Sequence, residues 1–221
     1  MTNPRLCVFP LKPEEAEQYM RIRHQVFSTT TFHNVLYAQG EPSQKTLDRV
    51  TSEIRDRLVQ GIHYLKCVDT STSEMIAGAS WHYLRAQEEG AKERPWEEVD
   101  AELIVPEPYD ESDPEMYKSL FTLLNTNKRK ILGNRPYYAL NTMVTLPNHE
   151  RRGAGNMLVR WGCDRADEAG VPAYVEASLM GAPMYARHGF QRVKQVEFDL
   201  SKWGGKGVMS ITLMLRPAKC E

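Results

Sequence analysis

Residues 144–170 read VTLPNHERRGAGNMLVRWGCDRADEAG, which is a strand end, a glycine-rich loop and a helix in one run. Pro147 stops the strand, Gly153 and Gly155 allow a tight turn, and a helix is expected from Asn156 to Ala169. Unpaired backbone N–H groups and the positive end of a helix dipole meet at such a loop, and glycines let phosphate oxygens come close. The pattern predicts a phosphate-binding loop, with a plain strand-to-helix turn as the alternative.

Two better-known phosphate loops do not fit this spacing. A dinucleotide loop G-x-G-x-x-G starting at Gly153 needs glycine at position 158, where the chain has Leu158. The G-K-[ST] of a P-loop occurs nowhere in the sequence. Arg151 and Arg152 add positive charge beside the glycines. The loop therefore supports neither a hydride carrier nor a nucleoside triphosphate as its ligand.

Outward from the loop, strand and helix patterns alternate, which predicts an α/β fold in a single domain over residues 1–221. The expected strands cover residues 6–9, 63–68, 75–83 and 137–146, and a turn-rich DTSTSE makes the middle two a hairpin. The expected helices start near residue 13 and cover residues 43–59 and 114–132. The last of these has Asp113 as its cap and Gly133 at its end.

An insertion over about residues 85–115 interrupts this alternation. From Glu88 to Glu115 it holds twelve acidic residues against Lys92 and Arg94, and three of its prolines, Pro95, Pro106 and Pro108, forbid a continuous helix or strand. We interpret it as an ordered insertion with local negative charge. A solvated loop without a binding role is the alternative.

Composition limits the class of protein. The 28 Lys and Arg residues balance 29 Asp and Glu residues, so the whole-chain basic excess of a dedicated nucleic-acid binder is missing. No apolar run approaches the roughly 18 residues of a membrane span. The scattered cysteines predict neither a disulfide framework nor a metal site; they are Cys7, Cys67, Cys163 and Cys220. We expect a soluble cytoplasmic protein with no metal, nucleic-acid or membrane partner.

A second motif, AYVEASLMGAPMYARHGFQRV, follows at residues 173–193. It is a strand, the polar Ser178, a short helix bearing Tyr185, and then Gly-Phe. The two motifs together resemble the GNAT family of N-acetyltransferases over roughly residues 137–198. That family's loop signature is R/Q-x-x-G-x-G/A, and Glu150 stands here at its first position, so Arg151 and Arg152 are expected to supply the positive charge.

The resemblance implies a mixed, mostly antiparallel twisted sheet that is splayed around the phosphate-loop strand, with helices on both faces. It implies acetyl-CoA as co-substrate, with its pyrophosphate in the loop and free N–H groups of the splayed strand on its thioester and pantetheine. The expected contacts are Met143, Val144, Thr145, Arg151, Arg152, Gly153, Ala154, Gly155, Asn156, Ser178 and Tyr185.

Acyl transfer from a thioester to an amine needs a neutral nucleophile, a polarised carbonyl and a proton for the leaving thiolate. An alkylamine has a pKa of about 10, so a base or a water chain must first remove a proton. Backbone N–H groups can polarise the carbonyl. By the resemblance, Tyr185 is the acid toward sulfur; the alternative is a core tyrosine on an apolar helix face.

Strand alternation suggests the base. One side of the later strand carries Tyr174, Glu176 and Ser178, and one side of the preceding strand carries Ala139, Asn141, Met143 and Thr145. We predict Glu176 as base, acting directly or through a water held by Asn141, against a purely structural role. His82 is the second candidate.

The resemblance places the acceptor site beside residues 27–40 and the acidic insertion with its Trp96. A small-molecule amine is the first expectation, and a cationic one would be steered by negative charge. A protein N-terminus or lysine is the second. A catalytically silent acyl-CoA binding module and a structural or partner-binding domain remain as rival functions. Acyl-chain length and oligomeric state stay open.

Overall fold

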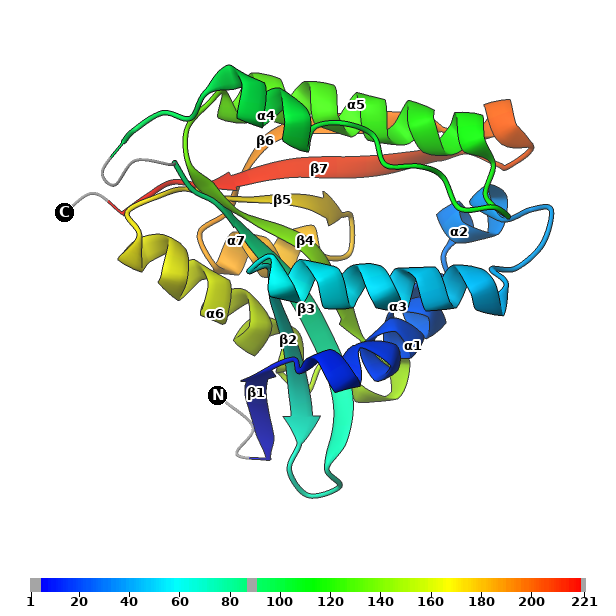
Figure 1. The fold of residues 1–221 in the computed structure, drawn as a ribbon, viewed down its shortest axis with the longest axis horizontal. Helices are drawn as coiled ribbons and strands as arrows, with labels where there is room; N and C mark the ends of the chain where they lie inside the picture. Colours follow the sequence, from blue (N-terminus) through cyan, green and yellow to red (C-terminus); the bar gives the residue numbers. More distant parts are fainter. Residues whose placement is uncertain (1–4, 87–90, 220–221) are drawn as a thin grey trace.

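The computed structural model describes residues 5–86 and 91–219, and its strands form one sheet (Figure 1). The strands are β1 (Leu6–Pro10), β2 (His63–Asp69), β3 (Glu74–Leu84), β4 (Tyr137–Thr145), β5 (Ala173–Ser178), β6 (Gln191–Asp199) and β7 (Val208–Arg216). Their order is β1-β2-β3-β4-β5-β7-β6. Among these neighbours only β4 and β5 run parallel. The predicted α/β class with a mixed, mostly antiparallel sheet is confirmed.

The helices are α1 (Ala16–Phe27), α2 (Thr31–Leu36), α3 (Gln44–Val59), α4 (Trp96–Glu102), α5 (Pro114–Leu132), α6 (Ala154–Glu168) and α7 (Ala182–Arg187). Short 3-10 turns lie at Pro13–Glu15, Pro147–His149 and Leu200–Trp203. Helix α5 has the predicted bounds because Asp113 accepts a hydrogen bond from the Met116 N–H at 2.8 Å. Helix α6 starts two residues before the prediction. Helices α2 and α4 were not expected; α2 lies within residues 27–40, and α4 lies in the acidic insertion.

Helix α6 covers one face of the sheet at very close range. A Cβ atom on its Gly162 would lie 2.1 Å from the ring of Trp81, which is fully buried in β3. The indole Nε1 of Trp81 donates to the carbonyl of Leu158 at 3.2 Å. Only glycine permits this contact, so residue 162 sets how near α6 lies to the strands.

The opposite face is covered by two separate groups of helices. Helices α1 and α3 pack over Tyr64 and Val144, whereas α5 packs over Tyr137 and Tyr174. Figure 1 shows α3 crossing in front of the sheet and α5 running above it. The space between the two groups becomes the main cavity of the molecule.

Strands β4 and β5 part soon after they pair. Their register holds only from Tyr138 to Leu140 on β4, and beyond it β4 stays with β3 alone. The expected splay of the sheet is confirmed. At the same point the pairing with β3 slips by one residue, which leaves Asn141 as an extra residue in a β-bulge.

This bulge corrects one expectation about strand faces. Ala139, Asn141, Met143 and Thr145 do not share a side, because the extra residue reverses the alternation. Ala139 packs in the cluster under α5, whereas Met143 packs against the cluster under α6. Asn141 lines the cavity and Met143 does not.

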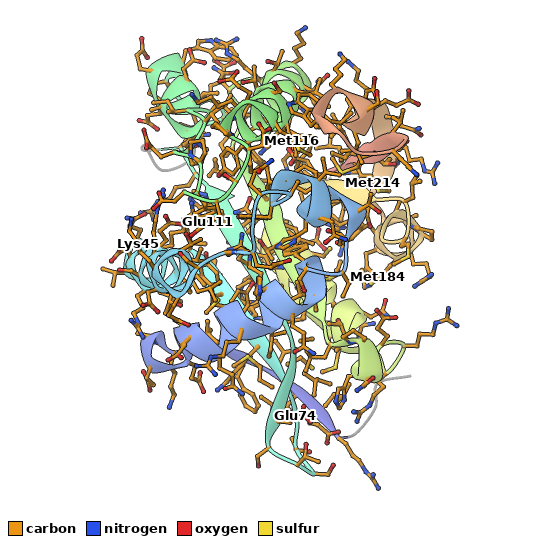
Figure 2. All side chains as sticks on the ribbon, turned by 90° about the vertical axis from the view of Figure 1, so that its right-hand side faces the viewer. Lys45, Glu74, Glu111, Met116, Met184 and Met214 are labelled. Atoms are coloured by element: carbon orange, nitrogen blue, oxygen red, sulfur yellow. The ribbon has the colours of Figure 1, made fainter. Side chains whose placement is uncertain are left out.

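The acidic insertion folds back onto α3. Between α4 and α5, Glu111 accepts hydrogen bonds from the Ser43 N–H at 3.1 Å and from the Thr46 hydroxyl at 2.6 Å. Lys45 of α3 donates to the adjacent Asp110 at 2.6 Å, and Figure 2 shows Lys45 and Glu111 on the same side of the molecule. Residues 87–90 of the insertion lie outside the described residues. The rest of it forms α4 and a bridge between the two helix groups.

Within residues 5–86 and 91–219, no helix is long and apolar enough to cross a membrane. No set of three or more His, Cys, Asp or Glu side chains is arranged there to hold a metal ion. Cys7, Cys67 and Cys163 are free thiols, and Cys220 lies outside the described residues.

Candidate active site

The glycine-rich loop ends in a row of free backbone donors. Gly153 caps α6 with φ at 102°, a left-handed conformation, although a Cβ there would meet nothing within 4 Å. Glycine is therefore needed for the backbone shape and not for space. Within the described chain, the N–H groups of residues 151–156 have no acceptor. These donors open a helix of 15 residues, which is the geometry that holds phosphate oxygens.

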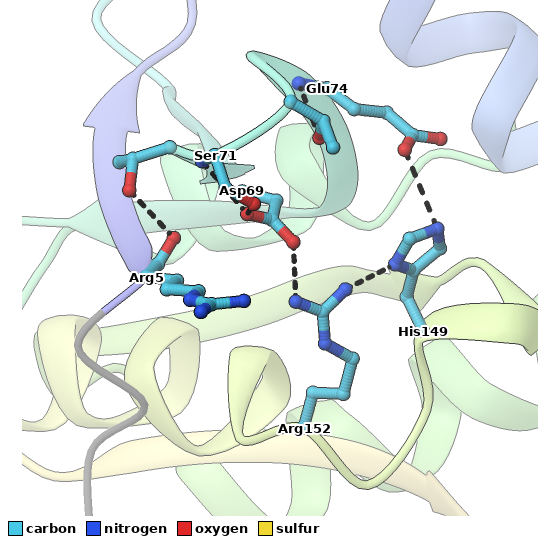
Figure 3. Close-up of polar contacts among 8 residues, drawn as sticks. Arg5, Asp69, Ser71, Glu74, His149 and Arg152 are labelled. Carbon is cyan, nitrogen blue, oxygen red and sulfur yellow. Dashed lines mark hydrogen bonds and ion pairs between the residues drawn. The ribbon is translucent and has the colours of Figure 1, made fainter.

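The two loop arginines differ in what they contact. Arg152 donates to Asp69 and bonds His149 Nδ1 at 2.6 Å, and His149 in turn lies 3.5 Å from Glu74 (Figure 3). This chain of contacts fastens the loop to the β2–β3 hairpin. The guanidinium of Arg152 is thus already occupied, so a direct cofactor contact by this side chain is not favoured. Arg151 is exposed and has no side-chain partner within the described residues.

Strand β4 turns alternate N–H groups toward the splayed side. Leu146 donates its N–H to Ile76 in β3 at 2.9 Å, so with a period of two Val144 also faces β3. Met143 and Thr145 therefore direct their N–H groups to the open side. This corrects the expectation for Val144, whose N–H is used within the sheet and whose side chain is buried beneath α1.

The loop, β4 and α7 meet at Gly155. A Cβ at this position would lie 3.2 Å from Met184 Sδ on α7 and 3.7 Å from Met143 Sδ on β4. Asn156 bonds His188 at the end of α7 through a 3.1 Å contact between Oδ1 and Nε2. The structure thus brings the predicted cofactor-binding elements together in one place.

Two further predicted cofactor contacts also have structural partners. Ser178 accepts the Gly181 N–H on its hydroxyl at 3.1 Å, which shapes the turn from β5 into α7. Ala154 is buried, so only its backbone N–H is available to a ligand.

Tyr185 on α7 is buried, with its ring edge-to-face to Phe190 at a centroid distance of 5.9 Å. Burial raises the pKa of its phenol to about 12, so the hydroxyl carries its proton at neutral pH. Among the described residues the hydroxyl has no hydrogen-bond partner. It is a proton donor that the protein itself leaves unused.

A cavity of about 500 Å³ lies between α3 and α5 on the other side of the splay. Glu176 and Asn141 both line this cavity. Glu176 lies on the face of β5 that is turned toward the cavity, and Asn141 is the bulged residue of β4. The Glu176 carboxylate lies 3.2 Å from Lys128 Nζ on α5 and accepts the Tyr174 hydroxyl at 3.3 Å. The carboxylate thus faces the cavity in a fixed position.

His82 lines the same cavity, but its environment makes it a weak base. Burial, followed by the positive charges of Arg94 and Arg57, lowers the pKa of His82 to about 4. The imidazole is neutral at pH 7 and has little tendency to take up a proton. Of the two candidates, Glu176 is the better placed.

Sequence comparison alone finds little. No protein-family model matches the chain. A segment of 46 residues, 21% of the chain, is 35% identical to a probable acyltransferase SID5 of Ajellomyces capsulatus. The match spans 34% of the length of that relative.

Solved structures match nearly the whole chain at low identity. A mosquito arylalkylamine N-acetyltransferase like 5b is 14% identical, with coverage of 95% and 98% of the two chains and a TM-score of 0.66. Drosophila melanogaster polyamine N-acetyltransferase is also 14% identical, with coverage of 95% and 98% and a TM-score of 0.62. A GNAT superfamily phosphinothricin acetyltransferase from Sinorhizobium meliloti, in complex with AcCoA, is 11% identical, covering 97% and 89%, with a TM-score of 0.59.

The chain has the GNAT acetyltransferase fold.

Within this GNAT fold, the walls of the cavity differ from those expected. Trp96 packs on Arg129 with the guanidinium 4.2 Å from the ring centroid, and it does not line the cavity. Residues 27–40 do not line it either; His33 and Tyr37 belong to a second cavity of about 80 Å³. Residues 102–109 of the acidic insertion do contribute.

Sequence reasoning missed the contribution of α3 to this wall. Arg49, Glu53 and Arg57 recur every four residues, which places three charged side chains on one face of a helix. All three line the cavity. A charged stripe of this kind was the available signal, since the apolar face of the same helix already accounted for its packing.

Proposed function

We propose that this chain is an acetyl-CoA-dependent N-acetyltransferase that acetylates a small amine by direct attack on the thioester. The observation that carries the proposal is the arrangement around the splay. Free N–H donors at the start of α6 lie on one side of the gap, and a cavity with a fixed carboxylate lies on the other. A cofactor on the first side and an amine on the second would meet at β4.

The residues present fit acetyl-CoA. The N–H groups of residues 151–156 are donors for the pyrophosphate, and exposed Arg151 adds positive charge. The N–H groups of Met143 and Thr145 supply donors along the splayed strand for the thioester carbonyl and the pantetheine. The thioester supplies the acetyl group and the leaving thiolate.

Side chains on the two sides of the gap between β4 and β5 carry out the proton transfers. Glu176 accepts a proton from the ammonium group, directly or through a water held by Asn141, which leaves a nucleophilic amine. The amine nitrogen then attacks the carbonyl carbon: a nitrogen–carbon bond forms, the carbon–sulfur bond breaks, and the nitrogen releases its second proton to water. The Tyr185 hydroxyl supplies the proton for the thiolate and regains a proton from water.

A small acceptor is supported by the size and enclosure of the cavity. A volume of about 500 Å³ suits a small molecule, and α3, α5 and the bridge of the acidic insertion surround it. The solved structures named above include enzymes for arylalkylamines and polyamines. The three cysteines among the described residues are free thiols, which fits action in the reducing cytoplasm.

The test combines cofactor binding with turnover. Calorimetry should detect acetyl-CoA binding, and thiol release should follow with at least one member of an amine library. Arg151→Glu should raise the Kd for acetyl-CoA about 10-fold through charge repulsion. Lys130→Glu, the same charge reversal on α5, should leave the Kd unchanged.

Each negative result selects a rival function. Acetyl-CoA binding without thiol release for any amine or peptide would indicate a silent binding module. Absence of binding would indicate that the loop only shapes a turn. Release with peptides alone would replace the small amine by a protein acceptor.

A further inference from the structure

The charges that line the cavity are balanced in number but not in their partners. Basic and acidic side chains contribute four each. They are Arg23, Arg49, Arg57, Lys128, Glu53, Glu102, Glu107 and Glu176. Which of them already hold a partner within the protein decides what a ligand would meet.

Three of the four carboxylates are already paired with a cation. Glu53 lies 3.0 Å from Arg49 Nε, and Glu176 lies 3.2 Å from Lys128 Nζ. Glu102 lies 2.6 Å from Arg94, whose side chain is only 2% exposed. The cavity therefore offers little uncompensated negative charge to a dication such as a polyamine.

Arg23 differs from these paired carboxylates because it is a charged side chain without a partner of opposite charge among the described residues. Its side chain is partly buried, lines both cavities, and has no ion pair or hydrogen bond among the described residues. Its guanidinium carbon lies over the ring of Phe27, 6.0 Å from the ring centroid. A guanidinium carries five N–H donors, and leaving them without acceptors in a partly buried position is costly.

A second polar group without a partner lines the same cavity, on the wall that α5 forms. Tyr117 of α5 lines the cavity, and its hydroxyl has no hydrogen-bond partner within the described chain. Burial raises the pKa of Tyr117 to about 12, and the charges of Glu53 and Arg23 both act on it. The hydroxyl is therefore a proton-bearing donor that lines the same cavity as the Arg23 guanidinium.

We propose that the acceptor is an amine that also carries a carboxylate, such as an amino acid, and that Arg23 and Tyr117 bind this carboxylate. The inference rests on the proposed function. Arg23 comes from α1, beside α3, whereas Glu176 comes from β5, so the two ends of the acceptor contact different walls of the cavity. A planar carboxylate matches the donor geometry of a guanidinium. The amine then reaches Glu176 beside the splay.

The experiment compares acceptors that differ only in the carboxylate. Thiol release from acetyl-CoA is measured with the natural amino acids and with their decarboxylated counterparts, such as tyrosine and tyramine or arginine and agmatine. At least one amino acid should exceed its counterpart in kcat/KM by about 10-fold or more. Arg23→Gln should raise KM for that amino acid about 10- to 100-fold, with little change for the counterpart.

Arg21→Gln is the matched control, since Arg21 lies on the same helix but is exposed and pairs with Glu17. It should leave both acceptors unaffected. Binding of N-acetylated amino acids and N-acetylated decarboxylated amines by calorimetry provides a second readout that does not require turnover. The carboxylated ligands should bind more tightly, and Arg23→Gln should remove the difference.

The possible failures are distinct. Turnover that favours decarboxylated amines, with the preference unchanged in Arg23→Gln, overturns the carboxylate site and leaves the acetyltransferase in place. Carboxylate-dependent and Arg23-dependent binding without thiol release from any amine supports the site and overturns the proposed reaction. Equal binding of both ligand series overturns the inference outright.

Discussion

At the scale of single residues, Tyr185 is the side chain whose role can be tested most sharply. Its phenol is buried, its pKa is raised to about 12, and it has no hydrogen-bond partner among the described residues. A tyrosine that served packing alone would contribute through its ring, which contacts Phe190. A proton donor would contribute through its hydroxyl.

We expect Tyr185→Phe to lose about 100-fold in turnover, because removing a positioned proton donor has an effect of this order. The ring and its packing remain, so acetyl-CoA affinity and the melting temperature should change little. Tyr138→Phe is the control, since Tyr138 belongs to the same core cluster and stacks on Tyr83 away from the loop. Turnover of Tyr185→Phe equal to that of the unchanged chain would remove Tyr185 from the mechanism.

At the scale of elements, the glycine-rich loop is held by a side-chain contact to a distant hairpin. Hydrogen bonds from Ser71 and then from Arg152 hold the pKa of Asp69 well below its usual range. Ionised Asp69 therefore stabilises the folded chain fully above its unfolded pKa, which is about 3.9. This contribution decreases as the pH falls below that value.

Asp69→Asn should consequently lower the melting temperature at pH 7, and the difference from the unchanged chain should shrink below about pH 4. The variant should also bind acetyl-CoA a few-fold more weakly, because Arg152 no longer fixes the loop. Melting curves across pH and calorimetry provide the two measurements. Asp56→Asn, an exposed position on α3, should show neither effect. A constant melting-temperature difference down to pH 2 would contradict the assigned role of the ionised carboxylate.

At the scale of the whole molecule, the segment between α4 and α5 joins the two helix groups that bound the cavity. Hydrogen bonds from Ser43 and Thr46 lower the pKa of Glu111 to about 2. The neighbouring Asp110 pairs with Lys45 at 2.6 Å, but both side chains are more than half exposed. Ion pairs between exposed side chains, such as Asp110–Lys45, contribute little to stability.

Glu111→Ala should therefore release the segment from α3, whereas Asp110→Ala should not. Hydrogen–deuterium exchange of residues 103–112 should be faster in Glu111→Ala, because the backbone N–H of Ser43 and the hydroxyl of Thr46 lose their acceptor. The KM for the acceptor should also rise in Glu111→Ala. Equal exchange in the two variants would show that the bridge does not depend on Glu111.

Features that depend on interactions between residues near each other in the chain were predictable from the sequence. The bounds of α5 were predictable because a cap, a first-turn proline and a terminal glycine act within a few residues. The loop at Gly153 was predictable for the same reason, since its φ of 102° is a local demand on the backbone. The order of the two motifs, and their resemblance to a known family, indicated the splayed sheet.

Tertiary structure alone decided features that depend on partners distant in the chain. The bulge at Asn141 arises from pairing with β3, and it moves Met143 to the opposite face. Arg152 finds Asp69 across 83 residues, and Lys128 finds Glu176, so which charges remain available to a ligand was not readable from spacing. Local conformational preference acts through neighbouring residues, whereas the free or paired state of a charge depends on how the whole chain packs.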